Sequence, residues 1–328
     1  MPTAQRSARI TEVDVLRGFA LMGITLANAV PLTGTASPAG GQGHWAYETL
    51  LHQRFFPIFS FLFGLSFGLF LDAVQQRTRS PRLLMLARLG FLIPFGALHR
   101  VLQPREVLLT YAIVGIAVLL PASFLPGWRT ILVLGGAATT AAALTTGGST
   151  LIPGLFLLGF AAKYGEQELL TLPTSSIGAA LAVTSVIAVT LNVQQIHYGL
   201  DSPSRLATTA GLATAAAYVM AAMLLLRSPI RPALNALAPA GRMALTNYIA
   251  ATPLILISDQ LFHLENKGDD GITLVLALGA AVFATELVFS LLWLRRARYG
   301  PLEWVWRCLT WWTLVPNASD GPSRNGSR

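Results

Sequence analysis

The sequence predicts an all-α fold, a polytopic membrane helix bundle with about ten transmembrane helices and both termini in the cytoplasm. Composition is the first observation behind this prediction: the 328 residues are 53% hydrophobic and only 12% charged, whereas soluble domains carry about 25% charged residues. The second is a series of apolar segments, each long enough to cross a bilayer as a helix. The third is the gathering of Arg and Lys in alternate connections, which orients the chain by the positive-inside rule.

The apolar segments, taken with a window of about 19 residues, define the expected helices. They cover residues 11–32, 55–74, 83–103, 106–125, 129–147, 148–165, 177–196, 207–227, 242–263 and 271–294. The fifth and sixth are interrupted by Gly147, Gly148 and Pro153 in a weakly polar run. In the second, Gly64 and Gly68 form a small-xxx-small face for close helix packing. The phenylalanines of that segment are expected to face lipid or neighbouring helices.

The expected topology places the N-terminus in the cytoplasm, and most Arg and Lys residues then fall inside as well. All five histidines fall outside: His44, His52, His99, His197 and His263. Histidine is the commonest general base near neutral pH, so this sidedness favours chemistry at the extracytoplasmic face, although histidine is also tolerated at membrane interfaces. We expect a multi-pass protein of the cell (plasma) membrane.

One domain is expected. Residues 1–315 form a single transmembrane helical domain that includes an interfacial helix near 300–314, whose Trp and Arg residues suit anionic lipid headgroups. Residues 316–328 are small and polar, so we expect a disordered tail. Membrane lipids are the expected partners, and a homodimer is left open.

Two classes of site are disfavoured. The net charge of +8 does not predict nucleic-acid binding, because the Arg residues lie between apolar runs and not on one surface. The single Cys308 excludes an internal disulfide framework and a zinc cluster, so no metal site is predicted.

The first apolar segment carries polar residues that are unusual in a membrane span. Charged side chains in a membrane span are rare and usually have a partner. Asp14 and Arg17 are one helical turn apart on one face, and Asn28 returns to nearly that face eleven positions later. Glu286, deep in the last segment, is a second such charge. We expect it to pair with Arg17 or Arg88.

Two further groups of polar residues lie near segment ends. His99, Arg100 and Glu106 are expected to gather at the outer turn between the third and fourth segments, either as an ion-paired hairpin or as part of a site. The ninth segment opens with Arg242 and then Asn247. A helix N-terminus with an Arg suits an anion, whereas a snorkelling Arg with interhelical Asn bonds is the structural alternative.

Four blocks of residues resemble the YeiB-like family of bacterial membrane proteins, which has no assigned function. They are residues 13–23 (VDVLRGFALMG), 56–64 (FPIFSFLFG), 241–248 (GRMALTNY) and 300–307 (GPLEWVWR). The blocks span almost the full length of the chain. The turn at 104–106 departs from the pattern, since a Gly-Asp pair is common there.

This family looks related to the transmembrane acyltransferase superfamily, which moves acyl groups from coenzyme A to acceptors at the far membrane face. The shared feature is the Asp-x-x-Arg-Gly opening, here Asp14 and Arg17. The bacterial sugar O-acyltransferases have a catalytic His where this chain has Asn28. The heparan glucosaminide N-acetyltransferase branch is more similar, because it has Asn there and its His in the first loop, which His44 fits to within one position. The carboxylate expected shortly before the Phe-Pro pair is Gln53 here.

The resemblance implies an acyltransferase with acyl-CoA (acetyl-CoA) as the donor substrate and a small molecule or glycan as the acceptor. His44 would be the general base or carry the acyl group transiently, and Asn28 would bind the oxyanion or orient His44. The anionic donor would be held on the inner side by Asp14, Arg17, Arg242 and Asn247.

Two alternatives stay open. A transporter or permease for a small anionic or lipid-linked substrate could use the intramembrane charges, and a non-catalytic membrane protein could retain them for folding. The motifs of the usual soluble enzymes, such as the P-loop and the GxSxG elbow, are absent from the sequence.

Overall fold

The fold is known from a computed structural model that describes residues 3–35, 41–145, 147–262 and 271–318, with the backbone alone for 3–10 and 166–171. Within these ranges the chain is helical and has no named strand; one isolated bridge pairs Ala297 with Ala318. The all-α prediction is therefore confirmed. His263 and most of the tail predicted to be disordered, 319–328, lie outside the described residues.

The predicted segments are helical, but two of them are divided, and α2 and α12 lie outside them. The first half of the chain forms α1 (Thr3–Leu32), α2 (Gln42–Leu50), α3 (Phe56–Gln75), α4 (Pro81–Gly90), α5 (Leu92–Leu102), α6 (Leu108–Val114), a π-helical turn (Gly115–Leu119), α7 (Leu120–Ala122) and α8 (Trp128–Thr145). The second half begins with a 3-10 turn (Gly148–Leu151). It continues with α9 (Ile152–Thr171), α10 (Thr174–His197), α11 (Arg205–Leu225), α12 (Arg231–Asn235), α13 (Ala238–Arg242), α14 (Ala244–Phe262), α15 (Gly271–Trp293) and α16 (Pro301–Trp311).

The number of spans is smaller than predicted. By length and composition, six helices of the described chain could cross a membrane, not ten. They are Thr11–Leu32, Phe56–Gln75, Pro81–Leu102, Thr174–His197, Arg205–Leu225 and Gly271–Trp293. The other four predicted spans are helical but shorter or more polar: Leu108–Ala122 is a shorter apolar helix broken by the π-helical turn, and α14 carries Asn247 and Asp259.

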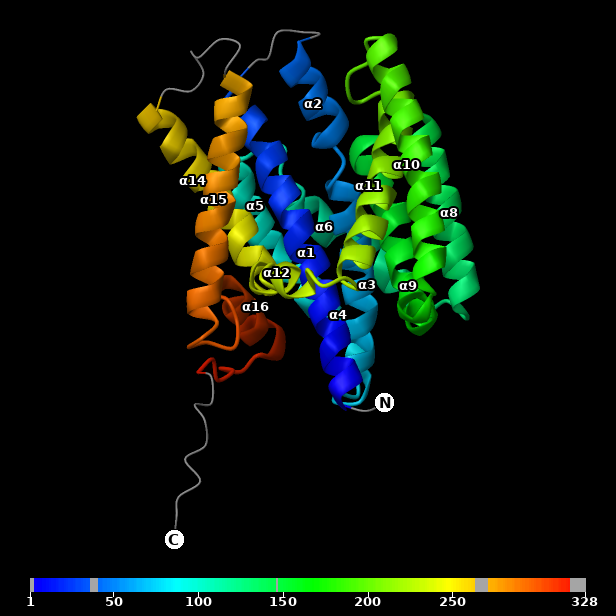
Figure 1. Cartoon of the computed structure of the whole chain (residues 1–328). Helices are drawn as coiled ribbons and strands as arrows, with labels where there is room; N and C mark the ends of the chain where they lie inside the picture. Colours follow the sequence, from blue (N-terminus) through cyan, green and yellow to red (C-terminus); the bar gives the residue numbers. More distant parts are fainter. Residues whose placement is uncertain (1–2, 36–40, 146, 263–270, 319–328) are drawn as a thin grey trace.

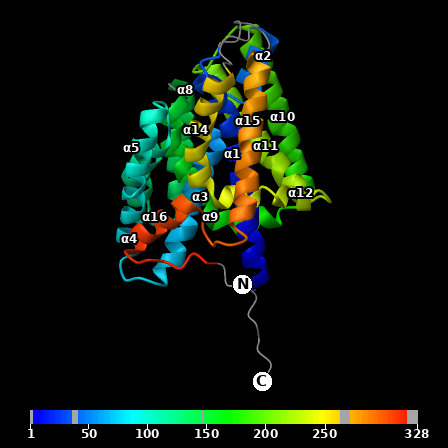
Figure 2. The ribbon, with the colours of Figure 1, turned by 90° about the vertical axis from the view of Figure 1, so that its left-hand side faces the viewer.

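The first helix organises the bundle. Figures 1 and 2 show α1 running through the middle of the molecule, and it packs against α3, α13, α14 and α15. The α8–α11 helices form the side of the bundle near α3, while α16 packs beside α4 in the lower part of the bundle (Figure 2). A buried core that includes Leu21, Ile24, Phe55, Leu62 and Leu92 joins α1, α3 and α5.

Glycines allow two close helix contacts. A Cβ added at Gly64 would lie 2.0 Å from the carbonyl oxygen of Phe156 on α9, and one added at Gly159 would lie 1.9 Å from that of Phe61. The predicted packing role of Gly64 is thus confirmed. Between α1 and α13, a Cβ at Gly241 would lie 1.9 Å from the carbonyl oxygen of Asp14. This second contact brings the Arg17 turn against the Arg242 end of α13.

A candidate ligand cavity

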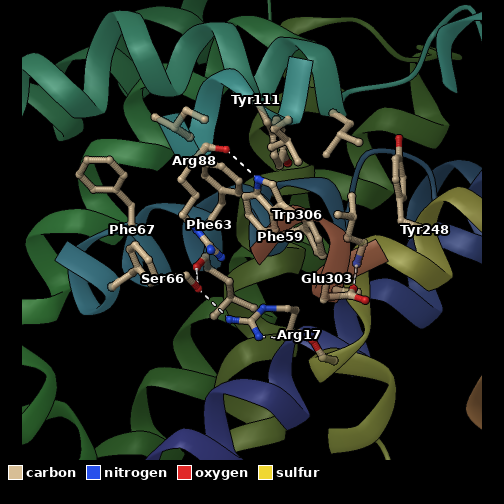
Figure 3. A pocket seen from close by; sticks show the side chains of 18 of the residues that line it. Arg17, Phe59, Phe63, Ser66, Phe67, Arg88, Tyr111, Tyr248, Glu303 and Trp306 are labelled. Atoms are coloured by element: carbon tan, nitrogen blue, oxygen red, sulfur yellow. Dashed lines mark hydrogen bonds between the residues drawn. The ribbon is translucent and has the colours of Figure 1, made fainter. Parts of the chain in front are cut away.

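An aromatic cavity lies between α1, α3, α4, α5, α6, α14 and α16 (Figure 3). Its volume is ≈ 220 Å³. Most of its lining is apolar, and the aromatic side chains are Phe59, Phe63, Phe67 and Phe70 of α3 with Tyr111, Tyr248 and Trp306. The polar side chains are few: Ser66, Arg17, Arg88, Arg242 and Glu303. A mostly apolar cavity with a few convergent polar groups is the usual form of a small-molecule site.

Arg17 lines the cavity as part of a fixed network. Its guanidinium donates to Asp14 Oδ1 at 2.8 Å, to Ser66 Oγ at 2.8 Å and to the Gly241 carbonyl at 3.3 Å. The predicted Asp14–Arg17 pair is therefore present one helical turn apart. Because its partners fix the guanidinium, Arg17 presents a positive charge in a defined place.

Arg88 is held differently. Its guanidinium lies between two aromatic rings, 4.3 Å from the centroid of Phe70 and 3.7 Å from that of Trp306. Trp306 Nε1 also donates to the Arg88 carbonyl at 2.7 Å, as Figure 3 shows. Among the described residues, no hydrogen bond or ion pair is made by the guanidinium itself. Arg88 thus offers a charge whose N–H donors are open to a ligand.

Glu303 of α16 closes one side of the cavity. Its carboxylate accepts the backbone N–H groups of Leu245 (2.7 Å) and Thr246 (3.0 Å) and the Thr246 hydroxyl. Burial raises the pKa of Glu303, and these hydrogen bonds oppose the rise. The free N–H groups that the sequence predicts for an anion at the start of α14 are therefore already capped by the protein's own acid.

Two of the four residues predicted to bind the donor line the cavity, namely Arg17 and Arg242. Arg242 is exposed and donates to the Arg298 carbonyl at 3.1 Å. Asn247 is 1% exposed, does not line the cavity, and bonds Ser290 Oγ at 2.9 Å. This is the interhelical bond that the sequence offers as the structural alternative.

The two predicted catalytic residues do not line the cavity. Asn28 is half-buried on α1, four residues beyond Ile24, which does line it. His44 lies on α2, where its Nε2 is 2.7 Å from Asp201 Oδ1 and its ring packs edge-on against Trp45. A carboxylate bonded to one ring nitrogen fixes the orientation of a histidine, as in many general bases. The structure does not bring His44 to Arg17.

A second histidine–carboxylate pair joins α2 to the turn that follows it. His44, Glu48 and the following His52 are each four residues apart, and His52 Nδ1 is 2.6 Å from Glu48 Oε1. The other Glu48 oxygen accepts the Ser202 N–H at 3.2 Å. Burial acts to raise the pKa of Glu48, but the hydrogen bond and charge of His52 and the Ser202 bonds outweigh it and lower the pKa. This face of α2 is thereby fastened to the α10–α11 connection.

The buried Arg54 fixes the next turn of the chain. Its guanidinium donates to the carbonyls of Thr49 and Ala207 and to the side chains of Asn192 and Gln195. Burial lowers the pKa of Arg54 to about 10. These four bonds tie the turn after α2 to α10 and α11.

The prediction for Glu286 is wrong. Both of its carboxylate oxygens are buried without a hydrogen-bond partner among the described residues, and the side chain is 3% exposed. Arg17 pairs with Asp14, and Arg88 is stacked between rings, so neither arginine reaches it.

The predicted outer cluster divides in two. Arg100 pairs with Glu106 at 3.4 Å, and Glu106 also accepts the N–H groups of Leu108 and Leu109. Burial raises the pKa of Glu106, and these bonds oppose it. His99 instead turns inward, is 2% exposed and bonds Thr252 Oγ1 at 2.8 Å.

Sequence reasoning missed most of the cavity wall. The phenylalanines of α3 were expected to face lipid or neighbouring helices, yet four of them line the cavity. The spacing of Phe59, Phe63 and Phe67 by four, beside the polar Ser66, is the signal that could have indicated it. No spacing rule connects Arg88 with Trp306, because they lie far apart in the sequence.

Comparison with known proteins gives consistent results. The family described as "Protein of unknown function (DUF418)" matches residues 160–313. An uncharacterized 39.9 kDa protein from the amylase 3' region of Bacillus acidopullulyticus is 34% identical over 330 residues, 92% of this chain and 94% of that protein. Uncharacterized protein YeiB of Escherichia coli (strain K12) is 40% identical over 75 residues, 23% of this chain and 19% of YeiB. Uncharacterized protein YxaH of Bacillus subtilis (strain 168) is 35% identical over 95 residues, 28% of this chain and 23% of YxaH.

Proposed function

This chain belongs to the DUF418 family of YeiB-like proteins, and we propose that it is a multi-pass cell-membrane acyltransferase that uses an acyl thioester of coenzyme A. The observation that carries the proposal is the aromatic cavity, whose Arg88 has open donors beside the fixed charge of Arg17. The acceptor is a small molecule or glycan at the extracytoplasmic face.

The cavity chemistry suits this donor. Guanidinium groups bind phosphate through charge-assisted hydrogen bonds, and a stacked guanidinium keeps its edge donors available. Coenzyme A joins a phosphate-bearing end to a narrow uncharged arm. A space of ≈ 220 Å³ with aromatic walls suits the arm and acyl group, with the phosphates beside Arg17, Arg88 and Arg242 in its wall.

The transfer itself needs a base and an oxyanion donor. In this proposal His44, oriented by Asp201, takes the proton of the acceptor hydroxyl or amine as that atom attacks the thioester carbonyl carbon. The Asn28 side chain donates to the oxygen that gains negative charge. The carbon–sulfur bond then breaks, and the thiolate leaves and takes up a proton. Support for Asn28 comes from Ile24, since residues four apart share a helix face and Ile24 lines the cavity.

Topology is part of the proposal. With both termini in the cytoplasm and about ten crossings, the Arg17 and Arg242 end of the cavity faces the compartment that holds coenzyme A. The shorter helix Leu108–Ala122 and the polar helices then cross the bilayer within the bundle, where neighbouring helices satisfy their polar groups.

Binding of acetyl-CoA to the purified protein in lipid nanodiscs tests the proposal. Arg88→Leu should weaken binding about tenfold or more, and Arg88→Lys should recover part of the loss. Arg82→Leu is the matched control, because Arg82 also stacks on a ring, that of Phe124 at 4.1 Å, but does not line the cavity. Acyl transfer or hydrolysis should disappear in His44→Ala while the fold is retained. Equal affinity in Arg88→Leu and the wild type would reject the cavity as the donor site.

A transporter is the second candidate, and Glu286 favours it. An intramembrane carboxyl without a partner is a common feature of ion and proton pathways. Uptake of an anion into proteoliposomes without loss of an acyl group would support transport over transfer.

A further inference from the structure

His99 lies in a buried polar cluster between α5 and α14. Its Nε2 is 2.8 Å from Thr252 Oγ1, and Thr252 donates to Gln103 Oε1 at 2.7 Å. All three side chains are buried, with 2% exposure for His99. Nδ1 of His99 is buried as well and has no hydrogen-bond partner among the described residues.

The hydrogen bonds fix which nitrogen of His99 carries the proton. The amide oxygen of Gln103 can only accept, so the single Thr252 hydrogen points to it. Thr252 must then accept from Nε2–H of His99. In the neutral ring Nδ1 is therefore a bare acceptor, and a buried acceptor without a donor is costly in free energy. A ligand N–H or O–H group would satisfy it.

The cluster adjoins the cavity. Tyr248 lines the cavity, and its ring lies edge-on to the His99 ring with centroids 5.0 Å apart. Thr252 follows Tyr248 by one turn of α14, and His99 follows the cavity residue Leu92 by two turns of α5. Tyr248 therefore lines the cavity and contacts the His99 ring, whereas His99, Thr252 and Gln103 do not themselves line the cavity.

We propose that the cavity continues past Tyr248 into a polar subsite formed by His99, Thr252 and Gln103, which accepts a hydrogen bond from an amide N–H or hydroxyl of the bound ligand. The ligand class is then an elongated molecule with an anionic end at Arg17 and Arg88, an uncharged middle and a hydrogen-bond donor farther along. This inference rests on the proposed function, because the amide-bearing arm of an acyl-CoA has that pattern.

Two probes separate the subsite from the anion site. Acetyl-CoA carries both the phosphates and the amide-bearing arm, whereas adenosine 3′,5′-bisphosphate carries phosphates without the arm. In lipid nanodiscs, His99→Phe should weaken the binding of acetyl-CoA about tenfold, which is the effect of one lost hydrogen bond. The affinity for adenosine 3′,5′-bisphosphate should stay unchanged. His99→Gln, which can donate to Thr252 and accept from the ligand, should restore most of the affinity. His197→Phe is the control, since His197 is an exposed histidine at the end of α10.

The outcomes are distinct. If the wild type binds acetyl-CoA and His99→Phe binds it equally well, the subsite is wrong and the donor proposal stands. If the wild type does not bind acetyl-CoA, both are wrong. Should His99→Phe fail to fold, Thr252→Val replaces it, because it removes the acceptor that sets the ring's proton. A several-fold loss of affinity for acetyl-CoA alone would support the subsite, and unchanged affinity for acetyl-CoA would overturn it.

Discussion

Arg17 and Arg88 show two ways to keep a guanidinium inside an apolar bundle. Arg17 has a carboxylate, a hydroxyl and a carbonyl as partners, whereas Arg88 has two aromatic faces. Stacking compensates part of the lost hydration without occupying the N–H groups. The guanidinium of Arg17 is therefore a fixed positive charge, whereas that of Arg88 keeps its N–H donors for a ligand.

Removing the charge of Glu286 and removing that of Asp14 should change the stability of the protein by very different amounts. Among the described residues, Glu286 has no cation as a partner, so we expect Glu286→Gln to change the thermal unfolding midpoint little. Asp14→Asn leaves Arg17 without its carboxylate and should destabilise by about 3 kcal/mol, as for other pairs shielded from water. Thermal unfolding in one detergent compares the two variants. A larger loss in Glu286→Gln than in Asp14→Asn would mean that Glu286 has a charged partner.

Glu48 should make the attachment of α2 sensitive to acid. The pKa of Glu48 in the folded protein lies below its usual value of 4.5. The stability that its ionised form contributes is therefore complete above pH 4.5 and is lost as the pH falls towards the lower pKa of the folded state. We expect the unfolding midpoint of the wild type to drop more steeply than that of Glu48→Gln as the pH falls below about 4.5. Parallel pH profiles for the two proteins would contradict this linkage.

The close contact between α3 and α9 depends on Gly159, which has no side chain. Gly159→Leu would drive a side chain into the Phe61 carbonyl, so we expect a loss of about 1–3 kcal/mol and a lower unfolding midpoint. Gly136→Leu on α8 is the matched control, because a Cβ there meets nothing within 4 Å. Equal midpoints for the two variants would show that α3 and α9 can separate at little cost.

The helices were predictable from sequence, and the number of spans was not. Apolar periodicity locates each helix, but it does not show whether a neighbouring helix gives a polar residue a hydrogen-bond partner. Asn247 bonds Ser290, 43 residues away, and this partner is invisible to a hydropathy window. Of the predicted site residues, only Arg17 and Arg242 line the candidate cavity. Glu303 and Trp306 meet α14 and α4 through tertiary contacts that no local spacing encodes.

For the whole molecule, the expected topology has a direct test. In a Cys308→Ser background, Leu200→Cys lies between α10 and α11, and Arg79→Cys lies between α3 and α4; both positions are exposed. A membrane-impermeant maleimide should label Leu200→Cys in intact cells and Arg79→Cys only after permeabilisation. The reverse pattern, or labelling of both in intact cells, would overturn the orientation and with it the cytoplasmic donor site.

The short helix α16 supplies Glu303 and Trp306, one polar and one aromatic residue of the cavity wall, from near the end of the described chain. During synthesis, Glu303 and Trp306 are added after every helix that could cross a membrane. Until then Arg88 lacks one of its two aromatic neighbours, and the start of α14 lacks its cap. Premature termination just before Pro301 would therefore yield a chain with all six candidate spans but without Glu303 and Trp306 in the cavity wall.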